Sequence, residues 1–187
     1  MQGTSKEKKT NNLQKARRAA KAVKLVIFDV DGVLTDGGII MDGDGSEYKK
    51  FNVRDGHGIK LLMLSGIQVG IITGRYSKVV ERRAHELGIK EVRQRCLDKA
   101  TPYAQMKKDL GVDDSQVAYV GDDIIDIPVL LRAGLPVAVA DADAEAKKYA
   151  LLVTKAKGGY GAAREAAEFI LKAKGLWDDL IGAYSKV

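Results

Sequence analysis

The chain has 187 residues, of which 45% are hydrophobic and 30% are charged, a globular composition that excludes collagen-like structure and disorder over the whole length. No apolar run approaches the roughly 20 residues of a membrane-spanning helix, so we expect no membrane partner. The single cysteine, Cys96, excludes an internal disulfide and fits a reducing compartment, from which we expect a cytoplasmic protein.

The net charge of +6 arises at the N-terminus, because residues 1–24 carry a local charge of +7 and the rest of the chain carries −1. This basic segment has no apolar stretch of the kind found in secretory signals. A contact with nucleic acid or anionic lipid is one interpretation of such a segment. We favour the alternative, a solvated and disordered leader over residues 1–22, and expect no nucleic-acid partner.

From residue 23 onward, short apolar runs alternate with stretches that have helical end signals. The runs are typical of buried parallel strands, and each helical stretch stops at a glycine. The predicted strands are 23–28, 68–72, 117–120, 136–140 and 151–153, and the predicted helices are 55–65, capped by Asp55, 77–87, 101–110 and 124–133. This alternation predicts an α/β fold, a doubly wound and mostly parallel sheet with a functional site at the carboxyl edge of its strands.

Residues 34–51 interrupt this alternation. Segments 37–41 and 46–51 flank Asp42-Gly43-Asp44-Gly45, a strong signal for a β-hairpin turn. Three successive apolar residues, Ile39, Ile40 and Met41, would lie on this two-stranded ribbon, which is marginally stable by itself. We therefore expect the hairpin to pack either on its own core or on another subunit.

The chain is expected to divide into the leader, a catalytic domain over residues 23–175 that includes the hairpin, and a C-terminal tail or helix over residues 176–187. Residues 158–161, with the sequence Gly-Gly-Tyr-Gly, predict a flexible joint before a helix at 162–173.

Polar and charged residues follow the predicted strands. In chain order they are Asp29 and Asp31, then Thr73, Gly74 and Arg75, then Lys99, and last Asp122, Asp123 and Asp126. An aspartate at a strand end is often no more than a helix cap, but four such positions in this order indicate one site.

The chemistry of these residues predicts phosphoryl transfer. Carboxylates two residues apart on an irregular turn can point in different directions, so that one attacks phosphorus and the other handles protons. Acidic groups crowded at one rim repel one another unless a cation lies between them, and hard oxygen ligands suit Mg²⁺. The hydroxyl of Thr73, the backbone N–H of Gly74 and the ammonium of Lys99 would supply further phosphate contacts.

At these residues the sequence resembles the haloacid dehalogenase (HAD) superfamily over about residues 24–140. The resemblance implies that Asp29 is the nucleophile and that Asp31 protonates the leaving alkoxide and then activates water. It also implies that Asp29, Asp122 and the backbone carbonyl of Asp31 bind Mg²⁺, and that Thr73 and Lys99 hold the phosphoryl group. Asp123 and Asp126 would orient metal-bound water and Lys99, and the order of their importance stays open.

A narrower resemblance covers about residues 23–175. The runs DVDGVLTDG (29–37), FNVRDGHG (51–58), IITGR (71–75) and GGYGAARE (158–165), together with the hairpin, resemble the 3-deoxy-D-manno-octulosonate 8-phosphate (KDO 8-phosphate) phosphatase family. This family implies a cap-less HAD fold, a sugar-phosphate substrate of lipopolysaccharide precursor synthesis, and a homotetramer in which a neighbour's hairpin or tail covers the site. The implied substrate contacts are Asp31, Asn52, Val53, Arg54, Asp55, Gly56, Lys60, Gly74, Arg75, Arg83 and Lys99.

Three alternatives stay open at this point. A sister family acts on a nine-carbon sugar-acid phosphate of the KDN 9-phosphate type, but typically has Glu at the position of Arg75, and a guanidinium fork suits the carboxylate of KDO. A phosphoacceptor receiver domain has a similar residue set, but its acidic pair follows the first strand and its acceptor Asp comes mid-chain. A non-catalytic partner with this fold is the third, although no motif residue is missing.

Overall fold

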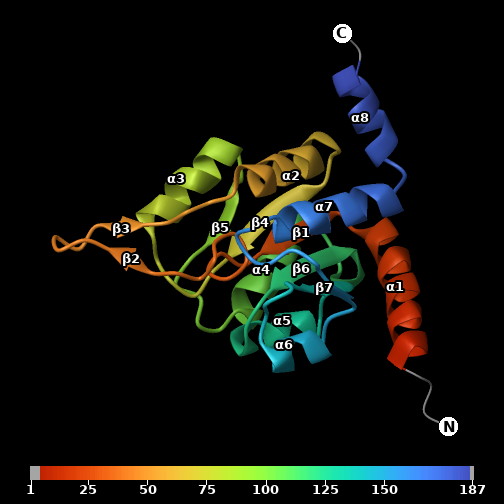
Figure 1. The fold of residues 1–187 in the computed structure, drawn as a ribbon, viewed down its shortest axis with the longest axis horizontal. Coiled ribbons are helices and arrows are strands. Elements are labelled where there is room, and N and C mark those ends of the chain that lie inside the picture. The colour runs from red at the N-terminus through yellow and green to blue at the C-terminus, as the bar shows by residue number, and fades with distance from the viewer. Residues whose placement is uncertain (1–4, 186–187) are drawn as a thin grey trace.

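The computed structural model describes residues 5–185 (Figure 1). Its centre is a six-stranded sheet in the order β5-β4-β1-β6-β7-β8, and every pair of neighbouring strands is parallel. This confirms the predicted fold class. The strands are β1 (Leu25–Phe28), β4 (Gln68–Ile72), β5 (Glu91–Arg93), β6 (Val117–Gly121), β7 (Leu135–Ala138) and β8 (Leu152–Val153), of which β5 was not predicted.

Side chains of the central strand β1 alternate between two apolar clusters. Val26 and Phe28 lie in the cluster that α1, α2, α3 and α7 cover, whereas Leu25 and Ile27 lie in the cluster under α4, α5 and α6 (Figure 1). These helices are α1 (Ser5–Ala22), α2 (Val53–Leu64), α3 (Lys78–Leu87), α4 (Ala100–Leu110), α5 (Ile127–Leu130), α6 (Ala144–Lys148) and α7 (Ala162–Ala173). Two single turns of 3₁₀-helix, η1 (Asp114–Gln116) and η2 (Ile124–Asp126), precede β6 and α5.

The start of α2 differs from the prediction. Asn52, not Asp55, caps this helix, because the Asn52 side chain accepts a hydrogen bond from the N–H of Arg54 at 2.8 Å. Asp55 lies inside α2, buried, and its carboxylate accepts from the N–H groups of Gly161 at 3.1 Å and Arg164 at 2.8 Å. Asp55 therefore caps α7, a distant helix that has no side-chain cap of its own.

The basic leader also differs from the expectation of disorder. Residues 5–22 form α1, while residues 1–4 lie outside the described part of the chain. Ala16 and Ala20 of this helix are fully buried, and α1 packs against α7. The ammonium of Lys174 donates to the carbonyls of Lys21 and Val23, both at 2.9 Å. Two alanines four residues apart thus lie on one face of α1 and pack against the body of the protein. The prediction of disorder considered only the net charge of the segment and overlooked this apolar face.

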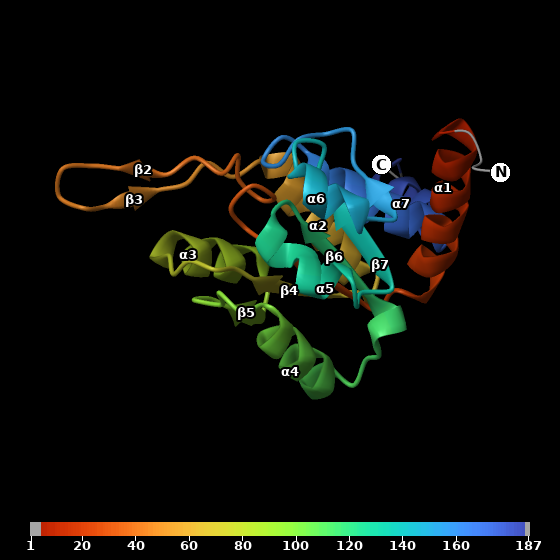
Figure 2. The same ribbon diagram turned by 90° about the horizontal axis from the view of Figure 1, so that it is seen from below.

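The predicted hairpin is present and projects from the body of the molecule (Figures 1 and 2). Its strands are β2 (Ile40–Met41) and β3 (Glu47–Tyr48). The side chains of Ile39, Ile40 and Met41 are between 52% and 60% exposed, so the hairpin does not pack on its own core. At the other end of the chain, α8 (Trp177–Ser185) follows α7 and has no buried residue.

The Gly-Gly-Tyr-Gly segment at 158–161 is not a flexible joint. Gly158 and Gly159 are buried, and the N–H of Gly159 donates to the carbonyl of Val33 at 2.9 Å. A Cβ atom on Gly158 would lie 1.7 Å from the carbonyl oxygen of Gly32, so glycine is required by close packing on the loop after β1. Between residues 5 and 185, no helix has the length and apolar character needed to cross a membrane.

Candidate active site

The residues predicted to form the site meet at the carboxyl ends of three neighbouring strands. Asp29 follows β1, Thr73 follows β4 and Asp122 follows β6, the edge of a doubly wound sheet where sites form. They line a pocket of about 160 Å³ whose wall consists of Asp29, Asp31, Thr73, Gly74, Arg75, Lys99, Asp122, Asp123 and Ile125. The structure thus brings together all the predicted catalytic residues.

Lys99 forms part of the wall of this pocket, and its side chain is only 1% exposed. Its ammonium contacts Oδ2 of Asp29 at 2.7 Å and Oδ1 of Asp126 at 2.5 Å. Burial by itself would lower the pKa of Lys99, but the two carboxylates outweigh this effect and raise it above the ordinary value. Lys99 is therefore a fixed cation beside the candidate nucleophile.

Asp126 is fully buried, and both oxygens of its carboxylate accept hydrogen bonds from other groups of the chain. Oδ1 accepts from Lys99 and from the hydroxyl of Tyr119, each at 2.5 Å, and Oδ2 accepts from the N–H groups of Asp122 at 2.8 Å and Asp123 at 3.1 Å. Asp123 is exposed and its side chain accepts from the N–H of Ile124 at 2.7 Å, where it caps η2. Of these two aspartates, Asp126 contacts Lys99 and Asp123 does not.

Asp122 has an unusual environment. Its Oδ1 is buried and has no hydrogen-bond partner among residues 5–185. Burial, reinforced by the charges of Asp29 and Asp126, raises the pKa of Asp122 to about 8. Gly32 makes this position accessible to the carboxylate: its φ of +86° is unfavourable for other residues, and a Cβ there would lie 2.0 Å from Oδ2 of Asp122.

These carboxylates fit a divalent cation. Oxygen atoms of Asp29, Asp122 and Asp126 lie within 4.8 Å of one another. The oxygens of Asp126 are already hydrogen-bonded, which leaves Asp29 and Asp122 as the side-chain ligands. Burial raises the pKa of Asp29 to about 6, opposed by Lys99 and supported by Asp126. A hard cation such as Mg²⁺ would satisfy the orphaned oxygen of Asp122 and relieve the repulsion. The Asp31 side chain lies outside this group, so a metal contact from that residue would come from its backbone carbonyl.

Asp31 faces the mouth of the pocket with its side chain 24% exposed. Its Oδ1 forms an ion pair with Lys49, and its Oδ2 lies 3.9 Å from Nε of Arg75. Nη2 of Arg75 donates to Oε1 of Glu47 at 3.0 Å. Glu47 and Lys49 were missed in the sequence, although their spacing of two on a predicted strand places them on one face.

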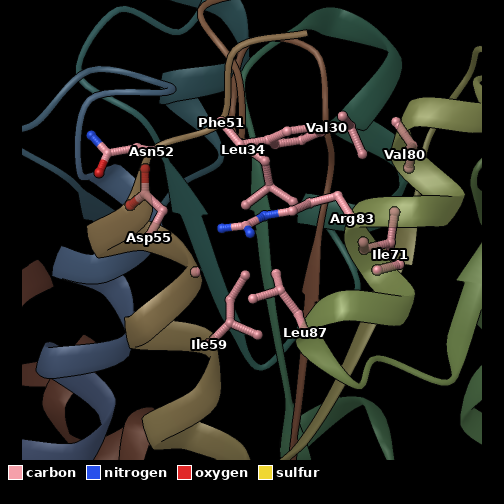
Figure 3. Close-up of a pocket in the computed structure, with 12 residues that line it drawn as sticks. Val30, Leu34, Phe51, Asn52, Asp55, Ile59, Ile71, Val80, Arg83 and Leu87 are labelled. Atoms are coloured by element: carbon pink, nitrogen blue, oxygen red, sulfur yellow. The ribbon is translucent and has the colours of Figure 1, made fainter.

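The predicted substrate contacts do not all gather here. Asn52, Asp55, Gly56 and Arg83 line a second, mostly apolar pocket, into which Arg83 extends from α3 (Figure 3). Its free volume is about 10 Å³, room for a single water molecule. Val53 and Arg54 are exposed, and the ammonium of Lys60 donates to the carbonyl of Glu86 at 3.4 Å. These three residues line neither pocket.

The candidate nucleophile follows the first strand of the sheet and the acidic cluster comes late in the chain, after β6. This order distinguishes the site from that of a receiver domain and fits a haloacid dehalogenase-like hydrolase. The family model of that description matches residues 91–164. The chain is 49% identical over 167 residues to the 3-deoxy-D-manno-octulosonate 8-phosphate phosphatase KdsC of Yersinia pestis, covering 89% of this chain and 87% of the relative. The KdsC of Escherichia coli K12 is 46% identical and covers 87% of each.

Two solved structures are also similar. A probable YrbI-family phosphatase from Pseudomonas syringae pv. phaseolica superimposes with a TM-score of 0.91 at 45% identity, covering 93% of this chain and 99% of that one. The KDO 8-phosphate phosphatase from Moraxella catarrhalis, solved with magnesium, phosphate and KDO, gives a TM-score of 0.90 at 41% identity, covering 91% and 98%. The chain belongs to the KDO 8-phosphate phosphatase family.

Proposed function

We propose that this chain hydrolyses 3-deoxy-D-manno-octulosonate 8-phosphate to KDO and phosphate through an aspartyl-phosphate on Asp29, in lipopolysaccharide precursor synthesis. The observation that carries the proposal is the buried Asp29–Lys99–Asp126 group beside the orphaned oxygen of Asp122. Mg²⁺ bound by Asp29, Asp122 and the carbonyl of Asp31 would neutralise negative charge on the phosphoryl oxygens.

In the first step, a carboxylate oxygen of Asp29 attacks phosphorus and the bond to the C8 oxygen breaks. Asp31 gives its proton to the departing alkoxide, which leaves as the KDO hydroxyl. Lys99, Thr73 and the N–H of Gly74 hold the phosphoryl oxygens at the pocket wall. In the second step, Asp31 takes a proton from a water molecule that attacks phosphorus, so that phosphate leaves and both aspartates return to their starting states.

The sugar acid would be recognised by Arg75 at the pocket mouth. Its side chain is 43% exposed, and Glu47 holds one end of the guanidinium. The remaining N–H groups suit the KDO carboxylate. Of the other proposed contacts, Asn52 lies at the second pocket with Asp55, Gly56 and Arg83, while Val53, Arg54 and Lys60 face outward.

This outward placement, together with the exposed hairpin, supports a homotetramer in which a neighbour's hairpin or tail covers the site. In such an assembly Ile39, Ile40 and Met41 would be buried between subunits. We place the reaction in the cytoplasm, where the single free cysteine would stay reduced.

The substrate is tested by comparing kcat/KM for KDO 8-phosphate and KDN 9-phosphate in the wild type, Arg75→Glu and Arg132→Glu. We expect the wild type to favour the eight-carbon ester and Arg75→Glu to lose at least about tenfold on it, a cost of about 1.4 kcal/mol. Arg132 is exposed and does not line the pocket, so its charge reversal is the matched control. A wild type that favours the nine-carbon ester would overturn the assignment, as would equal losses in the two variants.

A further inference from the structure

The base of the hairpin contacts both the active site and the loop behind it. Lys49 and Lys50 directly follow β3 (Glu47–Tyr48), and these two neighbouring side chains contact different parts of the molecule. Lys49 pairs with Asp31, and its ammonium lies 3.5 Å from Oε1 of Glu47. Lys50 pairs with Asp36 at 2.6 Å and donates to the hydroxyl of Tyr160 at 3.0 Å.

These two lysines differ sharply in burial. The side chain of Lys49 is 1% exposed, whereas that of Lys50 is 57% exposed. A buried ammonium is costly unless anions surround it, and Asp31 and Glu47 meet that need. The exposed pair of Lys50 with Asp36 contributes little, since solvent screens it. Lys49 is therefore a buried charge held by two carboxylates, whereas the neighbouring Lys50 is a solvent-exposed charge.

We propose that Lys49, at the base of the hairpin, is a positioning residue that fixes the carboxyl group of Asp31 for proton transfer to the leaving oxygen. The inference rests on the proposed function, because it takes Asp31 as the general acid. With Lys49 on Oδ1, the rotation of the carboxyl group is fixed and Oδ2 is turned toward Arg75 at the mouth of the pocket. Lys49 does not line the pocket wall, so it acts through Asp31 and does not bind phosphate.

In this role the base of the hairpin contributes to catalysis by positioning active-site side chains. Glu47 joins the two halves of the arrangement, because it contacts Lys49 on one side and Arg75 on the other. The same two-stranded ribbon thereby orients the proton donor and the guanidinium proposed to receive the sugar acid. A shift of the hairpin base would move both groups together.

The test uses the dependence of kcat/KM on the leaving group in Lys49→Met and Lys50→Met. An alkyl ester such as KDO 8-phosphate needs a proton on its leaving oxygen, whereas p-nitrophenolate departs without one. We expect Lys49→Met to lose at least about tenfold in kcat/KM on the alkyl ester and less than about threefold on p-nitrophenyl phosphate. Lys50→Met, which removes the same charge from the neighbouring residue, should leave this ratio unchanged.

Equal losses on both esters, or no loss on either, would overturn the proposal. Lys49→Gln, which keeps a hydrogen-bond donor, is the second variant should Lys49→Met fail to fold, and the same selective loss is expected in smaller measure. The rise in Tm on adding Mg²⁺ should be equal in all variants, since the cation site does not include Lys49. A wild type that hydrolyses a hexose 6-phosphate but not KDO 8-phosphate would overturn the proposed substrate alone, and the hexose ester then provides the alkyl arm.

Discussion

Two regions of the molecule hold functional residues in different ways: the projecting hairpin, and the strand-end group, which consists of Asp29, Thr73, Lys99, Asp122 and Asp126. At the strand ends, Lys99 and Asp126 are almost fully buried and their charged atoms contact other groups of the same chain. In the hairpin, Ile40 and Met41 are more than half exposed and the ribbon is fixed at its base. Contacts within the chain fix the positions of the side chains in the strand-end group. The hairpin is fixed only at its base, where it contacts the body of the molecule.

Each region is also incomplete in its own way. The strand-end group holds three carboxylates against one ammonium, and Asp122 has an oxygen with no partner among the described residues. The hairpin base has its charges paired, but the ribbon beyond it exposes apolar side chains. A cation would complete the first region, and an apolar surface would complete the second. This contrast can be tested separately at each region.

The largest effect is expected from Asp29→Asn. An amide cannot form the aspartyl-phosphate, so turnover should fall by at least about 10⁴-fold. Lys99 keeps Asp126 as a partner, and the fold should persist, which far-UV circular dichroism would check. Turnover near that of the wild type would contradict the assignment of the nucleophile.

A smaller effect distinguishes Asp123, which caps η2, from Asp126, the last residue of η2. Asp126→Asn removes a buried charge from Lys99 and also places an NH₂ group where a carboxylate oxygen accepts hydrogen bonds, either from Lys99 and Tyr119 or from two backbone N–H groups. This change should cost between about 3 and 5 kcal/mol of unfolding free energy and reduce kcat/KM by about 100-fold. Asp123→Asn is the matched control, because Asn caps a helix as well as Asp does, and its cost should stay within about 0.5 kcal/mol. Denaturant unfolding measures both, and a larger cost at Asp123 would reverse the ranking.

The strand-end group was predictable because its geometry follows from topology. Once Asp29, Thr73 and Asp122 each follow a parallel strand, the sheet itself brings them to one edge. The cation site was predictable for the same reason, since crowded carboxylates require an opposite charge. The contact of Asp126, and not Asp123, with Lys99 could not be predicted, because the sequence does not reveal which of two aspartates three residues apart is buried.

Contacts between distant segments were not predictable. Asp55 has the sequence position of a local cap, yet it caps α7, more than 100 residues away. The glycines at 158 and 159 have the composition of a flexible joint, yet they pack on the loop after β1. The leader has the charge of a disordered arm, yet Ala16 and Ala20 dock it on α7. In each case the local sequence pattern is present, but a contact with a distant segment determines the structure that forms.

Removal of Mg²⁺ tests the incompleteness of the strand-end group. Burial and neighbouring carboxylates raise the pKa of Asp122 to about 8, whereas in the unfolded chain it returns to about 3.8. Between these values the metal-free folded protein holds a proton that the unfolded chain has lost, so its stability falls as pH rises. Because Mg²⁺ replaces that proton and removes the penalty, the rise in Tm on adding it should be larger at about pH 8 than at about pH 5.5.

At a Mg²⁺ concentration one hundred times its Kd, the stabilisation is about 2.7 kcal/mol, which corresponds to an increase in Tm of about 5–10 °C. The Asp122→Asn variant is the control, and it should lose the increase at both pH values. A larger increase at the acidic pH would show that the carboxylates of this region are already ionised and satisfied without a cation.

The smallest effect on folding is expected in the hairpin, from Ile40→Asp. Ile40 is 52% exposed and belongs to neither apolar cluster of the described residues, so the unfolding free energy of dilute protein should change by no more than about 0.5 kcal/mol. The same change should abolish self-association in sedimentation experiments, because a carboxylate would be buried between subunits. Leu131→Asp is the matched control, because Leu131 is an apolar residue that is 64% exposed at the end of α5, outside the hairpin. This variant should leave sedimentation unchanged. If both variants sediment like the wild type, the exposed ribbon is not an interface, and the contrast between the two regions reduces to the cation site alone.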